Sequence, residues 1–425
     1  MKYCKLWCII IKKEHLFGDC MEKIILHCDL NNFFASATLT KNPTLKPFPV
    51  AVCGDSEKRH GIVLAKNNIA KGFGVKTAET IWEAKRKCPN LITLKPDFNL
   101  YETLSQKARK IYMDFSDKVE PFGIDECWVD ISNRGIDFIK GEEIAHIIKN
   151  RIKKELGVTV SVGVSFTKTF AKLGSDMKKP DAVTVITPQN FKEKVWPLSA
   201  SELLMVGKAT EKALRTMGIF TIGDIAKSDR TAIEKKLGKN GISLRDAANG
   251  VEKSTVLPFT NRGKPKSVSN SATAEQDLTN INQVFTAFLE FSECIAAKLK
   301  EEGLLAKQVG IQTTTFDFET KMYQAPLETP TDLAFIIAKA ALSLFEENCN
   351  FDKPFRAVGV RALQLTDKNT PATQMNLFEE NDNSKLKIIE ENMLDLREKY
   401  GKDAIKRAAC LSNKARSSSP GFYKR

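Results

Sequence analysis

The sequence predicts an α+β protein of several domains, and three observations lead to that prediction. The chain has 425 residues, enough for roughly two to four domains. Between residues 23 and 166 the strand and helix patterns follow the order β, α, β, β, α, β, which is typical of a split-βαβ, ferredoxin-like domain. A second α/β pattern begins at Ser267, after a stretch that is rich in proline and charge.

The first pattern is predicted from its apolar periodicity. Residues 23–28 form an apolar run that ends at Asp29 and reads as a buried strand, and the alternating valines of residues 158–166 predict a strand with one buried face. An insertion of about 65 residues follows the first strand and contains short strand and helix patterns of its own. The remaining elements are expected at residues 99–117 (helix), 118–124 and 126–131 (strands) and 141–155 (helix).

The second half of the chain is less regular. Residues 188–250 read as several short helices, residues 251–266 as a linker, and the following α/β pattern includes a strand at 309–316 and a helix at 331–347. Residues 367–384 are polar and are expected to be disordered. After them a helix is predicted whose apolar face holds Leu386, Ile389, Met393 and Leu396.

Composition narrows the class of protein. The net charge is +13 and the pI about 9.1, which favours a polyanionic partner, either nucleic acid or an anionic membrane surface. Scattered cysteines without a CxxC pair argue against a zinc site and for reduced thiols in a cytoplasmic protein. Apolar runs are too short for a membrane span, and residues 1–20 read as an N-terminal extension without a targeting signal.

Three acidic residues are candidates for catalysis. Asp29 ends the first strand, whereas Asp125 and Glu126 lie between two later strands. In the split-βαβ order the first and third strands are neighbours, so these carboxylates are expected to lie side by side. Hard divalent cations relieve the repulsion between such carboxylates, and two Mg²⁺ about 4 Å apart can support phosphoryl transfer. The alternative is that they are ordinary surface acids at strand ends.

Three longer motifs resemble the signature blocks of the Y family of DNA polymerases. They are HCDLNNFFAS at 27–36, FGIDECWVD at 122–130 and VGVSFTKTFAKLGSDMKKPD at 162–181, and the resemblance extends from about Met21 to Leu365. It implies a right-hand polymerase with a split-βαβ palm, small fingers, a helical thumb and an α/β little finger. The implied bounds are 21–32 and 98–187 for the palm, 33–97 for the fingers, 188–250 for the thumb, 251–266 for the linker, 267–366 for the little finger and 367–425 for a flexible tail that contains a short helix.

The resemblance also implies roles for residues of the active site. Asp29, Asp125 and Glu126 match the metal-binding and catalytic carboxylates, and the main-chain carbonyl of Leu30 matches a further metal ligand. The position two residues after the first acid, often acidic in the family, is Asn31 here, and we expect little loss from that change.

A nucleotide pocket is implied beside these acids. Phe34 matches the steric gate under the sugar, and Phe33 matches the neighbouring aromatic residue. Asn68 and Lys71 occupy the positions at which the family usually has a Tyr and an Arg for the triphosphate, and Lys179 matches a lysine that reaches the phosphates. Lysine can contact phosphate as a point charge but lacks the bidentate geometry of arginine.

Two further motifs concern larger partners. Residues 203–226 resemble a helix-hairpin-helix module whose hairpin, Val206, Gly207 and Lys208, would bind a DNA phosphate through backbone N–H groups. QMNLF at 374–378 resembles the peptide with which bacterial polymerases bind a sliding clamp, through Gln374, Leu377 and Phe378.

The expected function is template-directed DNA synthesis. The resemblance implies a monomeric, cytoplasmic enzyme that uses two Mg²⁺, primer-template DNA and deoxynucleoside triphosphates, performs error-prone translesion synthesis and lacks a proofreading exonuclease. Two alternatives remain at this point. A nucleotide cyclase has a related palm and paired acids, and a non-enzymatic, polymerase-like accessory protein would bind DNA without catalysis.

Overall fold

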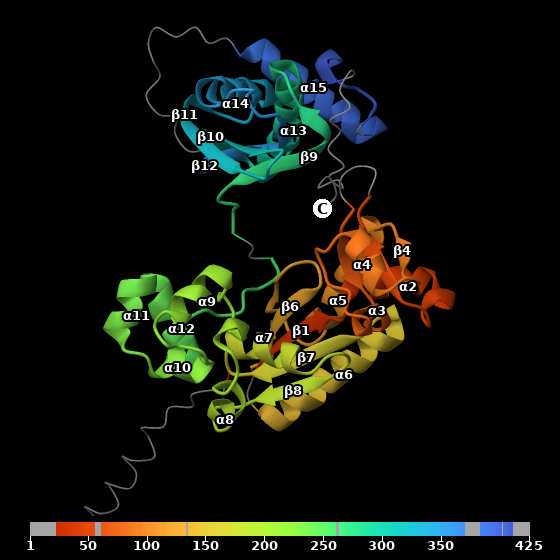
Figure 1. Cartoon of the computed structure of the whole chain (residues 1–425), viewed down its shortest axis with the longest axis vertical. Helices are drawn as coiled ribbons and strands as arrows, with labels where there is room; N and C mark the ends of the chain where they lie inside the picture. Colours follow the sequence, from red (N-terminus) through yellow and green to blue (C-terminus); the bar gives the residue numbers. More distant parts are fainter. Residues whose placement is uncertain are drawn as a thin grey trace, which may run out of the picture. The chain divides into compact units, whose positions relative to one another are not determined.

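The computed structural model describes residues 23–55, 61–132, 135–260, 263–369, 383–401 and 403–410, which form two compact units (Figure 1). The main part of the second unit begins at Gly263. Both units combine helices with β-sheets, so the predicted α+β architecture of several domains is confirmed.

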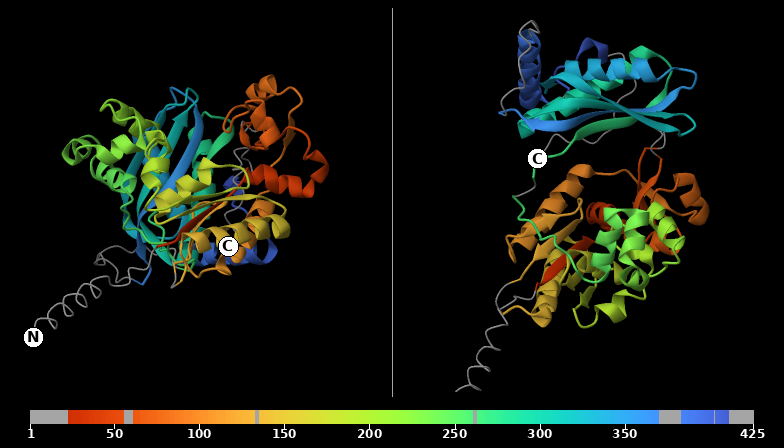
Figure 2. Two further views of the ribbon diagram at one scale, coloured as in Figure 1. Left: turned by 90° about the horizontal axis from the view of Figure 1, so that it is seen from below. Right: turned by 90° about the vertical axis from the view of Figure 1, so that its left-hand side faces the viewer.

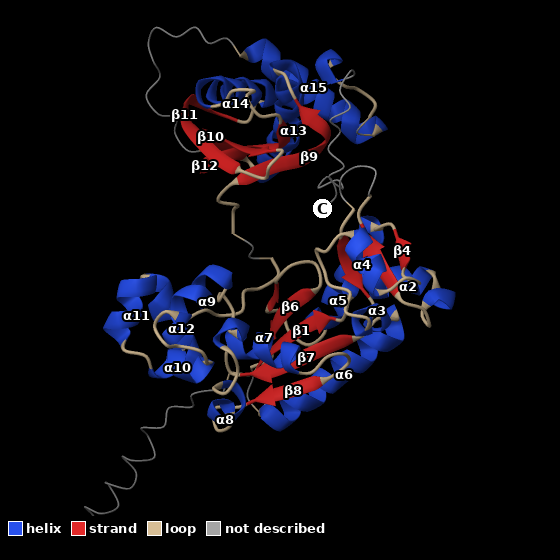
Figure 3. Cartoon of the chain, in the orientation of Figure 1, coloured by secondary structure: helices blue, strands red, loops and turns tan. Residues whose placement is uncertain are grey.

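A five-stranded sheet forms the centre of the first unit (Figure 3). Its strand order is β5-β6-β1-β7-β8, with β1 in the middle. β1 pairs antiparallel with β6 and with β7, so the first and third predicted strands are neighbours, as the split-βαβ order requires. The four-residue strand β8 was not predicted. The bounds are β1 Ile25–Leu30, β5 Val119–Pro121, β6 Glu126–Asp130, β7 Val160–Ser165 and β8 Val183–Ile186.

Helices cover both faces of this sheet, which explains why every residue of β1 is buried. On one face, α5 (Phe98–Met113) and α6 (Phe138–Leu156) enclose the main apolar core together with Leu26 and Cys28. On the other face lies α7 (Lys168–Met177), which contacts both β1 and β7. Because side chains alternate along a strand, His27 and Asp29 point to the α7 side. The helix α7 therefore lies directly over the acidic end of β1.

Gly163 of β7 allows this close approach. A Cβ atom at this position would lie 1.9 Å from the carbonyl oxygen of Ala171 and 2.6 Å from the backbone nitrogen of Ser175. Both of these atoms belong to the backbone of α7, so a small rotation of a side chain cannot relieve the overlap. The bare backbone of Gly163 thus sets the distance between α7 and the sheet.

The insertion after β1 forms a small subdomain, the predicted fingers. It contains a three-stranded sheet with the order β3-β2-β4 and a small core of its own. The strands β2 and β3 and the helices α3 and α4 were predicted within a few residues, whereas the helix α2, the turn η1 and the three-residue strand β4 were not. The bounds are α2 Phe33–Lys41, the 3₁₀ turn η1 Pro43–Leu45, β2 Val50–Cys53, β3 Val63–Lys66, α3 Asn68–Gly72, α4 Ile81–Lys87 and β4 Ile92–Leu94.

Short helices follow β8, in the region that was predicted to be the thumb. They enclose a separate apolar core that reaches Phe170 and Leu173 of α7. The beginning of the predicted linker lies on the palm, since Val256 is buried against Ile25 and Trp128 and the Leu257 N–H donates to Glu120 at 2.9 Å. The bounds are α8 Phe191–Val195, η2 Ala200–Glu202, α9 Lys208–Arg215, α10 Ile222–Lys227, α11 Arg230–Leu237 and α12 Lys239–Ala248.

The second unit is a four-stranded antiparallel sheet with two helices on one face (Figure 2). Its strand order is β11-β10-β12-β9, and α13 and α14 pack on the buried face. The open face carries polar side chains that line a shallow pocket, among them Ser269, Ser271, Gln312 and Arg361. In the described part of the chain no helix, α13 included, is both long and apolar enough to cross a membrane. The bounds are β9 Val268–Leu278, α13 Ile281–Glu302, β10 Leu304–Thr315, β11 Thr320–Thr331, α14 Ala334–Asn348 and β12 Phe355–Asp367.

The helix predicted in the tail is present as α15 (Ser384–Tyr400), and a buried carboxylate attaches it to the second unit. Glu390 accepts hydrogen bonds from the backbone N–H groups of Ala334 and Phe335, at 2.8 and 3.0 Å, and an ion pair with Arg407 completes its surroundings. The free N–H groups at the start of α14 are thereby satisfied. Of the predicted apolar face, Ile389 and Leu396 are 52% and 40% exposed, because the packed side is centred on Glu390 instead.

Glu390→Ala is expected to destabilise the second unit by about 1–3 kcal/mol, because it removes the acceptor of two N–H groups at the start of α14, whereas Arg407 keeps its ion pair with Glu293. Hydrogen exchange of the α14 amides in a urea series measures this change. Glu391→Ala, which removes an exposed carboxylate one residue away, is the control and should have no effect. Equal exchange in both variants would contradict the anchoring role of Glu390.

Candidate active site

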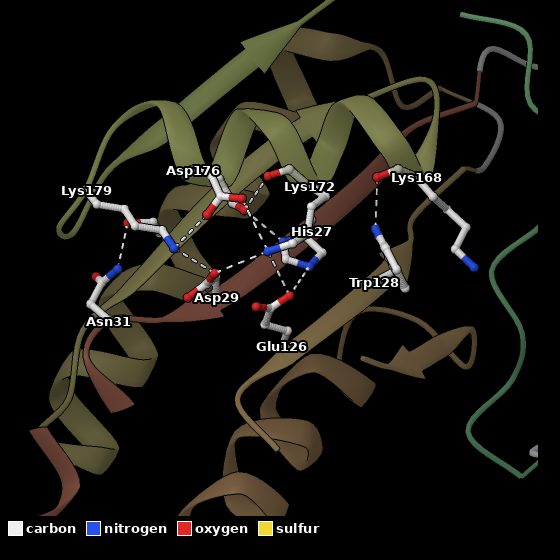
Figure 4. A network of polar contacts seen from close by, with 11 residues as sticks. His27, Asp29, Asn31, Glu126, Trp128, Lys168, Lys172, Asp176 and Lys179 are labelled. Carbon is white, nitrogen blue, oxygen red and sulfur yellow. Dashed lines mark hydrogen bonds and ion pairs between the residues drawn. The ribbon is translucent and has the colours of Figure 1, made fainter. Parts of the chain in front are cut away.

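Asp29 and Glu126 meet where β1 ends and β6 begins (Figure 4), and Asp125 directly precedes Glu126. Asp29 is paired with Glu126 across the two strands, and the Leu30 N–H donates to the carbonyl of Asp125 at 3.1 Å. A pocket of about 320 Å³ opens here. Its lining combines these acids with residues of the fingers and comprises Asp29, Leu30, Asn32, Phe33, Phe34, Leu64, Ala65, Lys66, Thr77, Ile124, Asp125, Glu126 and Lys179.

The three carboxylates differ in their electrostatic surroundings. Burial, together with the charges of Asp29 and Glu126, raises the pKa of Asp125 to about 6. Burial also raises the pKa of Asp29, although Lys179 opposes that shift. Burial would raise the pKa of Glu126 too, but contacts with His27 and Lys172 outweigh it and lower the value to about 2. Asp125 is therefore the carboxylate whose negative charge is least compensated by the protein.

Two lysines and a fourth acid complete the charge cluster. The ammonium group of Lys179 lies 2.7 Å from Asp29, and that of Lys172 lies 2.9 Å from Glu126. Asp176 contacts both lysines, at 2.8 and 3.3 Å. The sequence interpretation included Lys179 but missed Lys172 and Asp176. The available signal was their spacing within the third motif. Asp176 follows Lys172 by four residues and precedes Lys179 by three, which are the spacings of side chains on one side of a helix.

His27 lies beside the charge cluster and contacts Glu126. Its ring is fully buried, with Nδ1 2.8 Å from the hydroxyl of Ser175 and Nε2 3.2 Å from a carboxylate oxygen of Glu126. Burial lowers the pKa of His27, so the neutral imidazole predominates at neutral pH. The sequence interpretation missed this residue, because a histidine within a buried strand gives no sign of its partner.

Aromatic rings form the other wall of the pocket. The ring of Phe34 stacks on that of Tyr101, with centroids 4.4 Å apart and an interplanar angle of 10°. Phe98 meets Phe34 edge to face, and the hydroxyl of Tyr101 is hydrogen-bonded to Thr38 at 2.7 Å. Phe33 lines the pocket as well but is almost fully buried in the main core. Phe34 is thus held rigidly from behind.

The predicted triphosphate residues of the fingers lie at different depths. Asn68 and Lys71 are exposed and are absent from the pocket lining, although Asn68 accepts a hydrogen bond from the lining residue Asn32 at 2.9 Å. Lys66 does line the pocket and donates to Thr77 at 2.8 Å. Burial and the charge of Lys71 lower the pKa of Lys66.

Asn31, at the position that is often acidic in the family, has a structural role. Its side-chain N–H donates to Ser161 at 2.9 Å, and its side-chain oxygen accepts from the backbone N–H of Asp181 at 2.9 Å. These two bonds connect the end of β1 to β7 and to the segment that leads into β8. A buried amide satisfied in this way costs little to keep in place.

The predicted hairpin contributes no residue to the lining of this pocket. Gly207 caps the start of α9 and has open space around its Cα, and Lys208 is exposed. The side chain of Val206 is buried, so only its backbone is available to a partner. Gln374, Leu377 and Phe378 lie outside the described residues, as do residues 1–20.

The donor set of the site is suited to a divalent cation. As they stand, the described residues hold no group of three acidic, histidine or cysteine side chains arranged around a common metal position. Four carboxylates nevertheless share only two ammonium groups in this cluster, which leaves an excess of negative charge. Carboxylate oxygens are the ligands that Mg²⁺ prefers. The ammonium group of Lys179 contacts one carboxylate oxygen of Asp29.

Comparison with known proteins agrees with this arrangement. Residues 28–176 match the model of the impB/mucB/samB family, and residues 265–377 match the model of that family's C-terminal domain. A Y-family DNA polymerase chimera has a similar structure, with a TM-score of 0.71 and 23% sequence identity over 81% of this chain and 99% of the chimera. The fold is therefore that of a Y-family polymerase.

Curated relatives define the family more closely. DNA polymerase IV of Acetivibrio thermocellus is 46% identical over 93% of this chain and 99% of its own length. DNA polymerase IV of Bacillus velezensis is 34% identical over 92% of this chain and 93% of its own length. This chain belongs to the DNA polymerase IV family.

Proposed function

We propose that this chain is a DNA-directed DNA polymerase that adds deoxynucleotides to the 3′ end of a primer opposite a template. The observation that carries this proposal is the pocket in which Asp29, Asp125 and Glu126 face the aromatic ring of Phe34. The acids can hold the cations that bind the triphosphate and the reacting hydroxyl, whereas the ring can lie against the sugar. Translesion synthesis without a proofreading exonuclease, in the cytoplasm and as a monomer, follows from the family.

Mg²⁺ is the cation that we propose for this site. Asp29, Asp125, Glu126 and the carbonyl of Leu30 would hold it, with two ions per site. When bound, the ions would lower the pKa of the primer 3′-hydroxyl and stabilise the charge that develops on the phosphates. The protein's own contribution is to bring the carboxylates together at the edge of β1 and β6, with Lys179 beside them for the phosphates.

DNA contacts are proposed for two surfaces outside the pocket. The exposed hairpin at Gly207 and Lys208 can present backbone N–H groups to a phosphate, which requires no particular base sequence. In the second unit, the open face of the sheet carries Ser269, Gln312 and Arg361, which can follow a DNA backbone. The net charge of +13 supports both assignments, since phosphate contacts dominate nonspecific affinity.

Primer extension tests the proposed function. A labelled primer-template, the four deoxynucleoside triphosphates and Mg²⁺ should give products lengthened in steps of one nucleotide and dictated by the template. A nucleotide cyclase would instead convert ATP to a cyclic product without DNA. An accessory protein would bind the DNA and leave the primer unchanged, and that result would overturn the proposal.

A sliding clamp is the proposed protein partner of the QMNLF segment. Burying Leu377 and Phe378 in a groove would contribute about 1.5–3 kcal/mol each, and ordering of the segment would offset part of that gain. The affinity of the isolated contact should therefore be modest, about micromolar. Binding of polymerase and clamp to one DNA raises the effective concentration, so a weak contact is sufficient.

Replacing both Leu377 and Phe378 with alanine is expected to remove clamp stimulation and leave unassisted primer extension unchanged. The reason is that the two side chains would supply most of the apolar surface buried in the groove, whereas the chemistry is assigned to other residues. Extension rates with and without a loaded clamp measure the effect. Met375→Ala removes an apolar side chain from a variable position of the motif and should keep the stimulation. Stimulation of the double variant at the wild-type level would make QMNLF a chance match.

A further inference from the structure

Lysine side chains form ion pairs with two of the carboxylates that are proposed to bind a divalent cation (Figure 4). Lys179 contacts one carboxylate oxygen of Asp29 at 2.7 Å, and Lys172 lies 3.7 Å from that same oxygen. Lys172 also contacts Glu126 at 2.9 Å. A divalent cation that binds the carboxylate of Asp29 would compete with the ammonium group of Lys179 for the same negative charge and would weaken this ion pair. A displaced ammonium group in a partly buried site needs another anion.

Asp176 is the anion in position to receive it. One of its oxygens lies 2.8 Å from the ammonium of Lys179, and the other lies 3.3 Å from that of Lys172. Its side chain is 46% exposed, compared with 9% for Asp29, so it lies at the rim of the cluster rather than among the catalytic acids. It is absent from the lining of the pocket. Each lysine therefore already touches both its present carboxylate and Asp176.

Helix stability does not account for an acid at this position. Asp176 is in the last turn of α7, where the negative end of the helix dipole disfavours a carboxylate by about 0.3–1 kcal/mol. Lys172 also precedes Asp176, and an ion pair four residues apart stabilises a helix less in this order than when the acid comes first. Removal of the Asp176 charge should thus leave the helix intact or slightly more stable.

We propose that Asp176 is a positioning residue that holds the ammonium groups of Lys172 and Lys179 when a divalent cation and a nucleoside triphosphate enter the pocket. The proposal rests on the proposed function and deepens it. With Asp176 present, Lys179 moves from one anion to another and stays beside the phosphates. Without Asp176, both lysines have only the catalytic carboxylates as partners, so they compete more strongly with the cation.

Asp176→Asn in the full chain tests this role. We expect a rise of about tenfold in KM for the deoxynucleotide and in the Mg²⁺ concentration needed for half-maximal extension, as for other residues that orient a metal site through a neighbour. The kcat at saturating nucleotide and Mg²⁺ should change less than about threefold, because the catalytic carboxylates remain. Asp176→Glu should restore most of the affinity.

A measurement without turnover accompanies the kinetics. Binding of Mn²⁺ alone, followed by the paramagnetic resonance signal of the free ion, should be weaker in Asp176→Asn, and the melting temperature should not fall. Asp181→Asn is the matched control, since Asp181 also bridges two lysines, Lys149 and Lys153, at 3.3 and 2.9 Å but outside the pocket. This control should leave both KM and Mn²⁺ binding unchanged.

Three results would overturn the proposal. They are wild-type KM and Mn²⁺ affinity in Asp176→Asn, a loss confined to kcat, and an equal loss in Asp181→Asn. Failure of the wild-type chain to extend a primer would instead defeat the proposed function. The Mn²⁺ comparison would still decide the role of Asp176 in that case, because it requires no catalysis.

Discussion

Asp125→Ala should reduce primer extension by more than about a hundredfold while leaving DNA affinity largely unchanged. Loss of a residue that merely supports a metal ligand typically costs ten- to a hundredfold, so loss of a ligand itself should cost more. Asp125 has the least compensated charge of the three acids, as its raised pKa of about 6 indicates. The same effect is expected for Asp29→Ala and Glu126→Ala. Single-turnover extension, combined with DNA binding by fluorescence anisotropy, measures both quantities.

A measurement of stability distinguishes the loss of a catalytic group in Asp125→Ala from unfolding of the variant. The pKa of Asp125 is higher in the folded chain than its ordinary value of 3.8, so the folded wild type loses stability as the pH rises from about 4 through 6. The Asp125→Ala variant lacks this group and should be at least as stable as wild type at neutral pH. Near-normal extension by a well-folded variant would remove Asp125 from the catalytic set.

Phe34→Ala should improve the use of ribonucleotides relative to deoxynucleotides by about a hundredfold or more. An apolar pocket that merely tolerates an extra hydroxyl rejects it only about a hundredfold, whereas a rigid ring rejects it by overlap. Phe34 cannot move away from an added hydroxyl, because Tyr101 stacks behind it at 4.4 Å and Phe98 abuts its edge. The alanine variant removes the obstruction and leaves these supporting rings in place.

Ratios of kcat/KM for ribonucleotides and deoxynucleotides measure the change. Phe34→Tyr retains the ring and serves as the control, which should discriminate nearly as well as wild type. The change should appear mainly as a gain with ribonucleotides, since the acids and Lys179 are untouched. An unchanged ratio in Phe34→Ala would place the sugar gate at another residue.

The order of elements could be predicted from the sequence because long periodic segments determined it. The alternating valines of β7 and the apolar run of β1 define the palm, and their connection order makes Asp29 and Asp125 neighbours. The short strands β4 and β8 were not predicted, and length alone does not explain this, because β2, β3 and β5 are equally short and were predicted. The pairing of β4 and β8 depends on the neighbouring strands.

Parts of the site that depend on packing between elements were not predictable. Lys172 and Asp176 reach the acids only because α7 turns that side toward β1, which no pattern within the helix specifies. Likewise, the apolar pattern of α15 placed Ile389 on the packed face, whereas a buried Glu390 determines the orientation. Buried polar partners belong to distant segments, and a single sequence does not pair them.

The charge cluster is sensitive to a substitution at Gly163, although this residue does not line the pocket. Among the described residues, β7 supplies none that lines the pocket, yet a single methyl group at position 163 would push against the backbone of α7. The helix carries Lys172 and Asp176, so any lift would draw these side chains away from the acids together. Even the replacement of Gly163 by alanine should therefore not be tolerated. A survey of tolerated substitutions should find this position as intolerant as a catalytic carboxylate.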